Sequence, residues 1–235
     1  MAQPPPALAA DYQQDGPEAK RIAATIPYYP FHGVPRFYDI SGMLADPTVF
    51  QLCIDVFVQR YAASSKQEID CIFGLDARGF VLGPSIALAL KKPFIMLRKK
   101  GKLPNAITGA EYQKEYKSVD NAATGTDELC MPKMAFDFWT NQKEAASSGA
   151  AEDGAATSMS TTSDKPRALI IDDLVATGGT LLAACDLVST AGAEIVECAC
   201  IVELKALRGY EKLQAKHPGV KVWALISEEI LTREG

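Results

Sequence analysis

Residues 168–180 read ALIIDDLVATGGT, and this stretch decides the fold. Its first four residues are apolar, which is typical of a buried strand, and they end in the adjacent acids Asp172 and Asp173. A short loop of small and hydroxyl-bearing residues follows, and a helix is expected from Thr180 onward. The stretch therefore predicts a strand, a tight turn and a helix in direct succession.

The same succession of a strand and a helix occurs earlier in the chain, and further strands follow. The expected strands are residues 69–75, 93–98, 168–172, 195–204 and 220–226. The expected helices are residues 46–65, 80–90, 180–190 and 209–216. Strands that alternate with helices indicate an α/β fold, in which helices cover both faces of a mostly parallel sheet.

The loop between Asp173 and the helix predicts an anion site. A helix N-terminus offers unpaired N–H groups and the positive end of the helix dipole. Gly178 and Gly179 let the backbone approach an anion, and Thr177 and Thr180 add hydroxyl donors. An ordinary turn with a capping threonine is the alternative. The combination of apolar strand, paired acids and Thr-Gly-x-Thr favours the anion site.

Two other phosphate-binding motifs, the Walker A loop and the G-x-G-x-x-G fingerprint, are absent from this segment. The segment instead resembles the signature of type I phosphoribosyltransferases, which binds phosphoribosyl pyrophosphate (PRPP). This resemblance implies a Rossmann-like core, a small N-terminal hood, a flexible catalytic loop and Mg²⁺ held mainly by PRPP. It further implies that the ribose hydroxyls bind Asp172 and Asp173, directly or through water on Mg²⁺. The residues implied to cradle the 5-phosphate are Ala176, Thr177, Gly178, Gly179 and Thr180.

Other motifs narrow the choice of base. Many members that use 6-oxopurines carry an acid where this chain has Ala176, and the orotate branch has a different loop. The loop here is similar to that of the branch that uses adenine. Four further motifs share this similarity: Phe37-x-Asp39-Ile40-Ser41, Gly74-Leu-Asp-Ala-Arg78-Gly-Phe80, residues 97–104 and Glu111-Tyr112-x-x-Glu115-Tyr116. The resemblance thus implies transfer of the phosphoribosyl group from PRPP to adenine, giving AMP and pyrophosphate in purine salvage.

Two basic stretches are expected to bind the diphosphate of PRPP. Asp76, Ala77 and Arg78 follow a predicted strand and open a helix, where a guanidinium can contact a diphosphate in a bidentate manner. The resemblance implies a cis peptide bond between Asp76 and Ala77. Arg98, Lys99 and Lys102 would neutralise pyrophosphate, partly across a homodimer interface. The alternatives are a capped turn and a solvated basic face.

The resemblance also implies the catalytic groups. Glu115 would donate a proton toward the purine N7, Tyr116 would contact pyrophosphate or close the loop, and Arg78 would complete this set. The plain alternative is a charged loop. Lys117 stands where the family usually has glycine, so the hinge of the loop departs from the family pattern.

The base slot is expected in the hood. Phe37 would stack on the purine, and the main chain of Arg36 and Tyr38 would read its edge, so that a 6-oxo group leaves an acceptor unpaired. Leu204 would form the other wall. Packing of Phe37 in the core is the alternative.

Composition sets the remaining limits. The 235 residues carry a formal charge of −5, which argues against a nucleic-acid partner, and no apolar run is long enough to span a membrane. Residues 118–165 hold eight acids and three lysines, which gives −5, so the rest of the chain is neutral. The expected parts are a flexible leader (1–24), a hood (25–45) and a core (46–235) with an insertion loop over about 118–165. Six cysteines without a C-x-x-C pair indicate a reducing compartment, and the default location is the cytoplasm.

Three alternative functions stay open at this point. One is a phosphoribosyltransferase for hypoxanthine or guanine, against which Ala176 argues. Another is a PRPP-sensing regulator of the same fold, which should have a basic surface or an added DNA-binding module. A PRPP synthase is the third, although the sequence has no ATP motif of its own.

Overall fold

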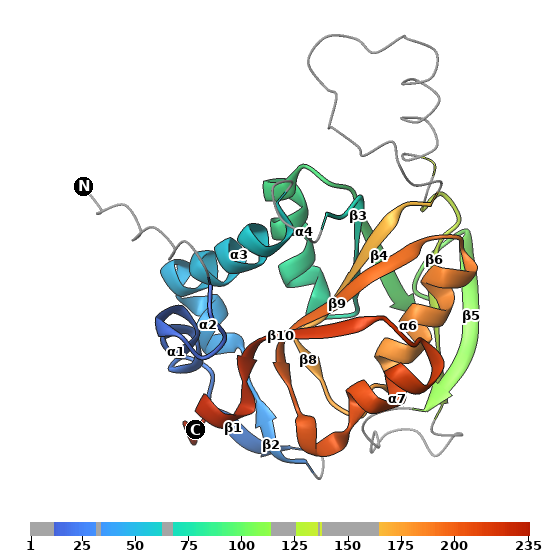
Figure 1. Ribbon diagram of the computed structural model, residues 1–235. Coiled ribbons are helices and arrows are strands. Elements are labelled where there is room, and N and C mark those ends of the chain that lie inside the picture. The colour runs from blue at the N-terminus through green and yellow to red at the C-terminus, as the bar shows by residue number, and fades with distance from the viewer. Residues whose placement is uncertain (1–11, 32–33, 63–67, 114–125, 136, 138–164) are drawn as a thin grey trace, which may run out of the picture.

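The computed structural model describes the hood and the core of the protein. The described residues are 12–31, 34–62, 68–113, 126–135, 137 and 165–235. They form an eight-stranded sheet in the order β10-β9-β7-β3-β4-β6-β5, and β8 pairs with β9 beside this path (Figure 1). A separate two-stranded sheet consists of β1 and β2.

The centre of the large sheet is parallel. Its strands are β3 (Cys71–Leu75), β4 (Phe94–Lys99), β7 (Arg167–Ile171), β9 (Glu194–Glu203) and β10 (Lys221–Ser227). The short strand β8 (Leu174–Val175) is also parallel to β9. The predicted α/β sheet is therefore confirmed, and the predicted bounds of these long strands lie within two residues of those observed.

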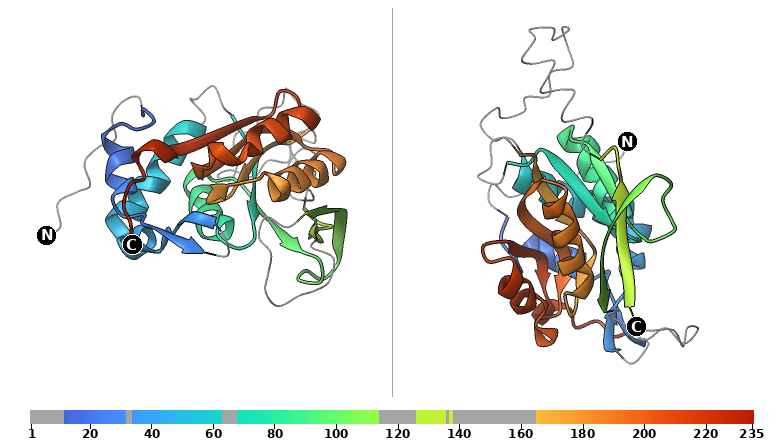
Figure 2. Two further views of the ribbon diagram at one scale, coloured as in Figure 1. Left: turned by 90° about the horizontal axis from the view of Figure 1, so that it is seen from below. Right: turned by 90° about the vertical axis from the view of Figure 1, so that its right-hand side faces the viewer.

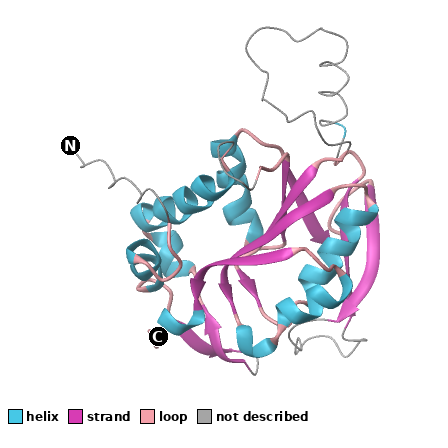
Figure 3. Cartoon of the chain, in the orientation of Figure 1, coloured by secondary structure: helices cyan, strands magenta, loops and turns pink. Residues whose placement is uncertain are grey.

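Helices cover both faces of this sheet (Figure 3). The helices on one face are α3 (Pro47–Tyr61) and α4 (Gly79–Leu90), and those on the other are α6 (Gly179–Thr190) and α7 (Gly209–Lys216). The strands alternate between the two faces, since Leu169 and Ile171 of β7 join the first core and Ala168 and Ile170 join the second. A strand buried on both faces is apolar along its buried length, as β7 is from Ala168 to Ile171.

The N-terminal part forms a hood next to the C-terminal residues (Figure 2). Its elements are α1 (Pro17–Ala23), β1 (Tyr28–Phe31), β2 (Val34–Tyr38) and α2 (Ser41–Ala45). The Asp39 carboxylate accepts hydrogen bonds from the amide and hydroxyl of Ser41, at 2.9 and 2.6 Å, and these bonds lower the pKa of Asp39. The Asp-Ile-Ser motif thus fixes the turn between β2 and α2.

The expectation of a flexible leader over residues 1–24 is wrong for residues 17–23, which form α1. Pro17 starts this helix, and Ala19 and Ile22 are fully buried in the core shared with α3. Proline suits the first turn of a helix, and burial of these side chains offsets the entropy lost on ordering the segment. Residues 1–11 lie outside the described part of the chain.

The expected insertion over about 118–165 also needs correction. Residues 126–132 form β6 (Thr126–Pro132), which pairs antiparallel with β4 and with β5 (Ala106–Gln113). Leu129, Cys130 and Met131 are buried there, so this part of the segment belongs to the core. This strand was not predicted, because Asp127 and Glu128 are adjacent acids and no apolar residue of the strand precedes Leu129. The remainder of the segment lies almost wholly outside the described residues.

All six cysteines are free and buried. Burial raises the pKa of the Cys53 thiol to about 12, so this group is unreactive at neutral pH. In the described ranges, no helix is both long and apolar enough to cross a membrane.

Candidate active site

The phosphate loop predicted at residues 176–180 lies between β8 and the start of α6. Gly178 takes a left-handed conformation (φ +75°) at the N-cap of α6, which favours glycine. A Cβ atom on Gly178 would lie 2.7 Å from the Gly209 carbonyl oxygen, so a side chain has no room there. The loop therefore brings backbone amides to the N-terminus of a twelve-residue helix, as an anion site requires.

Two carboxylates precede this loop. Asp173 is buried, and its Oδ2 lies 3.2 Å from Nη1 of Arg78 without a hydrogen bond of good geometry within the described protein. Burial raises the pKa of Asp173, and the positive charge of Arg78 opposes this rise. Asp172 is half-buried and accepts a hydrogen bond from the Asp173 amide at 2.9 Å. Asp173 is thus held toward Arg78, whereas Asp172 is partly open to solvent.

The turn after β3 lies against the end of β7. A Cβ on Gly79, the first residue of α4, would meet the Ile171 carbonyl oxygen at 2.5 Å. The Asp76–Ala77 peptide bond is cis, as the family resemblance implied. Because β3 and β7 are parallel neighbours, their carboxyl ends bring the Asp76 turn and the phosphate loop to one edge of the sheet.

Arg78 connects this edge with the hood. Its guanidinium lies 4.9 Å from the ring centre of Phe37 on β2 and also contacts Asp173. The ring that was expected to stack on a base is therefore close to a carboxylate that was expected to hold a sugar. The arrangement of Phe37, Arg78 and Asp173 could not be predicted from the sequence, since Phe37 and Asp173 are far apart in the chain.

The other residues of the predicted base slot are placed as follows. Tyr38 is buried, and its hydroxyl donates to Glu228 at 3.2 Å, so this side chain serves packing. The Arg36 guanidinium lies 5.0 Å from the ring centre of Tyr28. Leu204 is buried, and its amide donates to the Val175 carbonyl at 2.9 Å. These side-chain positions agree with a slot in which Arg36 and Tyr38 offer only their main chain.

The basic run at the end of β4 is divided between two sets of partners. Arg98 Nε lies 3.1 Å from Oδ2 of Asp76, and its guanidinium lies 5.7 Å from the ring centre of Phe80. Lys99 instead pairs with Asp127 at 2.9 Å, and Lys100 pairs with Glu128. These two acids lie on β6 and were not recognised in the sequence, because they were assigned to the insertion.

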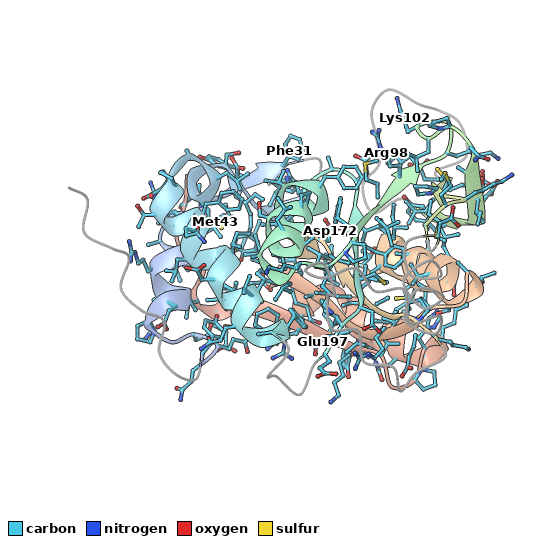
Figure 4. The ribbon with its side chains drawn as sticks, turned by 90° about the horizontal axis from the view of Figure 1, so that it is seen from above. Phe31, Met43, Arg98, Lys102, Asp172 and Glu197 are labelled. Carbon is cyan, nitrogen blue, oxygen red and sulfur yellow. The ribbon has the colours of Figure 1, made fainter. Side chains whose placement is uncertain are left out.

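Figure 4 relates these groups in space. Phe31, Arg98 and Lys102 lie along one margin of the molecule, Glu197 lies along the opposite one, and Asp172 lies between them. Lys102 is exposed, and its carbonyl accepts from Arg98 at 3.5 Å. Two of the predicted diphosphate ligands, Arg98 and Lys102, therefore lie together on one margin of the molecule.

The predicted catalytic pair, Glu115 and Tyr116, lies outside the described residues. The preceding part of that motif is described, and it forms the end of β5. Glu111 and Tyr112 pair there with Glu128 and Asp127 of β6. The motif thus begins on an ordered strand.

Comparison with known proteins places this site in a family. Residues 41–223 match the model of the phosphoribosyl transferase domain. Adenine phosphoribosyltransferase 2 of Arabidopsis thaliana is 39% identical over 206 residues, which cover 86% of this chain and 88% of the relative. The chain belongs to the adenine phosphoribosyltransferase family. The mouse adenine phosphoribosyltransferase, a further relative, is 37% identical over 84% of this chain and 92% of its own.

Solved structures of adenine phosphoribosyltransferases share the fold. The enzyme of Trypanosoma brucei, in complex with AMP, pyrophosphate and ribose-5-phosphate, has a TM-score of 0.70 at 29% identity and covers 94% of this chain and 84% of its own. That of Leishmania donovani has a TM-score of 0.71 at 27% identity, with the same two coverages. These similarities confirm the type I phosphoribosyltransferase fold that the sequence motifs implied.

Proposed function

We propose that this protein transfers the 5-phosphoribosyl group from PRPP to adenine and releases AMP and pyrophosphate. One observation carries the proposal: Arg78 lies between the Phe37 ring and the Asp173 carboxylate, at 4.9 Å and 3.2 Å. A purine stacked on Phe37 would therefore lie beside the groups that hold the sugar. This is the arrangement that joining a base to C1 of a ribose phosphate requires.

The phosphate loop would hold the other end of the sugar. Its amides and the hydroxyls of Thr177 and Thr180 are suited to the 5-phosphate, because a helix N-terminus favours negative charge. Asp172 and Asp173 are suited to the ribose hydroxyls. Arg78 and Arg98 carry the positive charge that stabilises the departing pyrophosphate. Lys99 and Lys102 add to this charge in our proposal.

Proton transfer is assigned to the loop after β5. Attack of the purine N9 on C1 of the ribose leaves a surplus proton on the base, and this proton must leave N9 or N7 before neutral AMP is formed. A carboxylate near N7 can accept the proton, and the resulting carboxylic acid can return it to N7 in the reverse reaction. We assign this role to Glu115 and assign the contact with pyrophosphate to Tyr116. Both assignments rest on the Glu-Tyr motif and on the end of β5, where Tyr112 pairs with Asp127, the partner of Lys99.

Magnesium fits this site as a partner of PRPP. Among the described residues, Oδ2 of Asp173 is a buried carboxylate oxygen without a hydrogen-bond donor of good geometry, and oxygen ligands are those that Mg²⁺ prefers. Over the residues that the structure describes, no group of three or more His, Cys, Asp or Glu side chains is placed to hold a metal. We therefore propose that PRPP supplies most of the ligands and that Asp172 or Asp173 contacts the hydrated ion. When bound, Mg²⁺ neutralises charge on the diphosphate.

Assembly and location complete the proposal. Val81 and Leu88 of α4 and Met96 of β4 are exposed apolar side chains, and Leu88 is 81% exposed. Val81 and Leu88 are seven residues apart and lie on one face of the helix. We propose that this face contributes to a homodimer. We also propose a location in the cytoplasm, a reducing compartment in which cysteines stay free, as all six are here.

Nucleotide formation tests the proposed reaction. The purified protein is incubated with PRPP, Mg²⁺ and adenine, hypoxanthine or guanine in separate reactions, and the products are separated by chromatography. AMP should form, and the two 6-oxopurines should react far more slowly, because each would leave a buried acceptor unpaired. Comparable turnover of hypoxanthine or guanine would contradict the proposed base slot, and failure to consume PRPP with any base would contradict the function.

A further inference from the structure

Gly209, the first residue of α7, lies directly against the phosphate loop. A Cβ atom at this position would lie 2.4 Å from the Ala176 carbonyl oxygen and 3.0 Å from the Gly178 amide nitrogen. From the opposite side, a Cβ on Gly178 would meet the Gly209 carbonyl oxygen at 2.7 Å. The two backbone segments are therefore in contact, and neither position has room for a side chain.

The chain after β9 is directed to this contact by its backbone. Val175 of β8 pairs with Glu203 of β9, and the Val175 carbonyl accepts from the Leu204 amide at 2.9 Å. A short 3₁₀ turn, η1 (Lys205–Leu207), follows. Arg208 then takes a left-handed conformation (φ +55°) that turns the chain into α7. Gly209 consequently lies against the phosphate loop.

Helix α7 is itself anchored, so that it can resist movement of the loop. Leu213 is fully buried in the core on that face of the sheet. His217 Nε2, at the end of α7, lies 2.8 Å from Oδ1 of Asp186 on α6. Helix α7 is thus fixed to α6, the helix whose N-terminus forms the phosphate site, and the two lie side by side (Figure 1).

We infer that Gly209 is a positioning residue for phosphate binding. Its backbone blocks outward movement of the Ala176 carbonyl and the Gly178 amide, and so keeps the loop amides directed toward the ligand. Gly209 contacts the loop rather than the substrate, so its effect passes through residues 176–178. The inference rests on the proposed function, because it assigns the 5-phosphate of PRPP and AMP to this loop.

The variant Gly209→Ala tests this role. An ordinary carbon contact is 3.4 Å or longer, so a Cβ at 2.4 Å from the Ala176 oxygen forces the segments apart by about 3.4 − 2.4 = 1.0 Å. A displacement of this size at a binding site can reduce activity by about 10²-fold. We expect the KM for PRPP and the Kd for AMP to rise by about 10- to 100-fold, while the KM for adenine stays within about twofold, since the base slot is not displaced.

Gly219→Ala is the matched control. Gly219 follows α7, and a Cβ there meets no atom within 4 Å, so this variant adds the same methyl group without contacting the loop. Its φ of +102° makes alanine unfavourable, so it should lower Tm and leave the KM for PRPP unchanged. If Gly209→Ala is folded and binds AMP like the wild type, the inference is wrong, whereas the proposed function stands. If the wild-type protein binds neither AMP nor PRPP, the proposed function itself fails.

Amide hydrogen exchange of the wild type gives a second measurement that needs no variant. If the loop and α7 are coupled, AMP should slow exchange both at residues 177–180 and at the amides of Gly209 and Tyr210. Protection confined to residues 177–180 would overturn the inference even if Gly209→Ala does not fold.

Discussion

Glu197 offers a direct test of what stabilises the fold away from the active site. Its carboxylate is buried on β9 and accepts three hydrogen bonds: from Arg60 Nε at 2.7 Å, from Arg60 Nη2 at 2.8 Å and from the Tyr61 hydroxyl at 2.6 Å. The Arg60 guanidinium also lies 4.5 Å from the ring centre of Trp223 on β10. The cluster therefore joins α3 to two strands of the sheet.

The variant Glu197→Gln removes the charge while it keeps the shape of the side chain. Removing one partner of a buried ion pair costs about 3–5 kcal/mol, because the other charge is left uncompensated. The Arg60 side chain is 28% exposed and can reach water in part, so we expect the low end of this range, about 3 kcal/mol. For a chain of this size, this corresponds to a decrease in Tm of about 6–12 °C.

Thermal unfolding followed by circular dichroism measures this change. The double variant Arg60→Met with Glu197→Gln removes the stranded cation and should be more stable than Glu197→Gln alone. The control Glu211→Ala breaks the exposed Arg208–Glu211 pair and should leave Tm unchanged. A decrease below about 2 °C for Glu197→Gln, or no recovery in the double variant, would refute the assigned role of the charge. The KM for PRPP should not change in any of these variants.

Three further predictions concern the site. Glu115→Gln should lower kcat by about 10²–10⁴, because Glu115 transfers the proton at N7 in our proposal, whereas Glu111→Gln on β5 should leave kcat unchanged. Steady-state kinetics that show wild-type kcat for Glu115→Gln would remove Glu115 from the mechanism. Burial raises the pKa of Asp173, so this group stabilises the unliganded fold fully below its unfolded pKa of about 3.8, and the contribution is lost as pH rises through the raised folded value. We therefore expect the Tm of Asp173→Asn to depend less on pH than the Tm of the wild type over the acidic range. If the plots of Tm against pH are parallel for the two proteins, the buried Asp173 carboxyl group is not the cause of the pH dependence. Asp127→Asn should release Lys99 from its ion pair and so lower the KM for PRPP at low salt. Added salt should abolish this difference. An unchanged KM at low salt would show that the Lys99–Asp127 pair does not compete with the diphosphate.

The parallel core could be predicted from the sequence because its signals are local. Each central strand contains a run of apolar residues, and Gly178 with its neighbours marks the turn into α6. Two elements, β6 and α1, were not predicted, because their own sequences do not indicate burial clearly. In β6, the acids Asp127 and Glu128 precede the buried residues, and their partners Lys99 and Lys100 lie on a strand that is distant in sequence. Helix α1 was missed because only its packing against α3 explains its order.

For the site, the residue types could be predicted but their mutual contacts could not. The motif around Asp76 predicted a turn, but not that Arg78 would lie between Phe37 and Asp173. Gly209 carried no signal at all, since a lone glycine before a short helix is ordinary in a sequence. Only the distance to the Ala176 carbonyl oxygen distinguishes it.

These contacts divide the sheet into two functional ends. At the carboxyl end of β3 and β7, polar groups face each other at close range, and Asp173 remains buried with an oxygen that lacks a hydrogen bond within the described protein. A fold optimised for stability alone would not retain such a group, because an unsatisfied buried acceptor costs about 1–3 kcal/mol. The Glu197 cluster, toward the opposite margin, satisfies its charge with three hydrogen bonds (Figure 4). Stability is thus concentrated where no ligand is expected, and this allows the substrate end to keep groups whose partners arrive with PRPP.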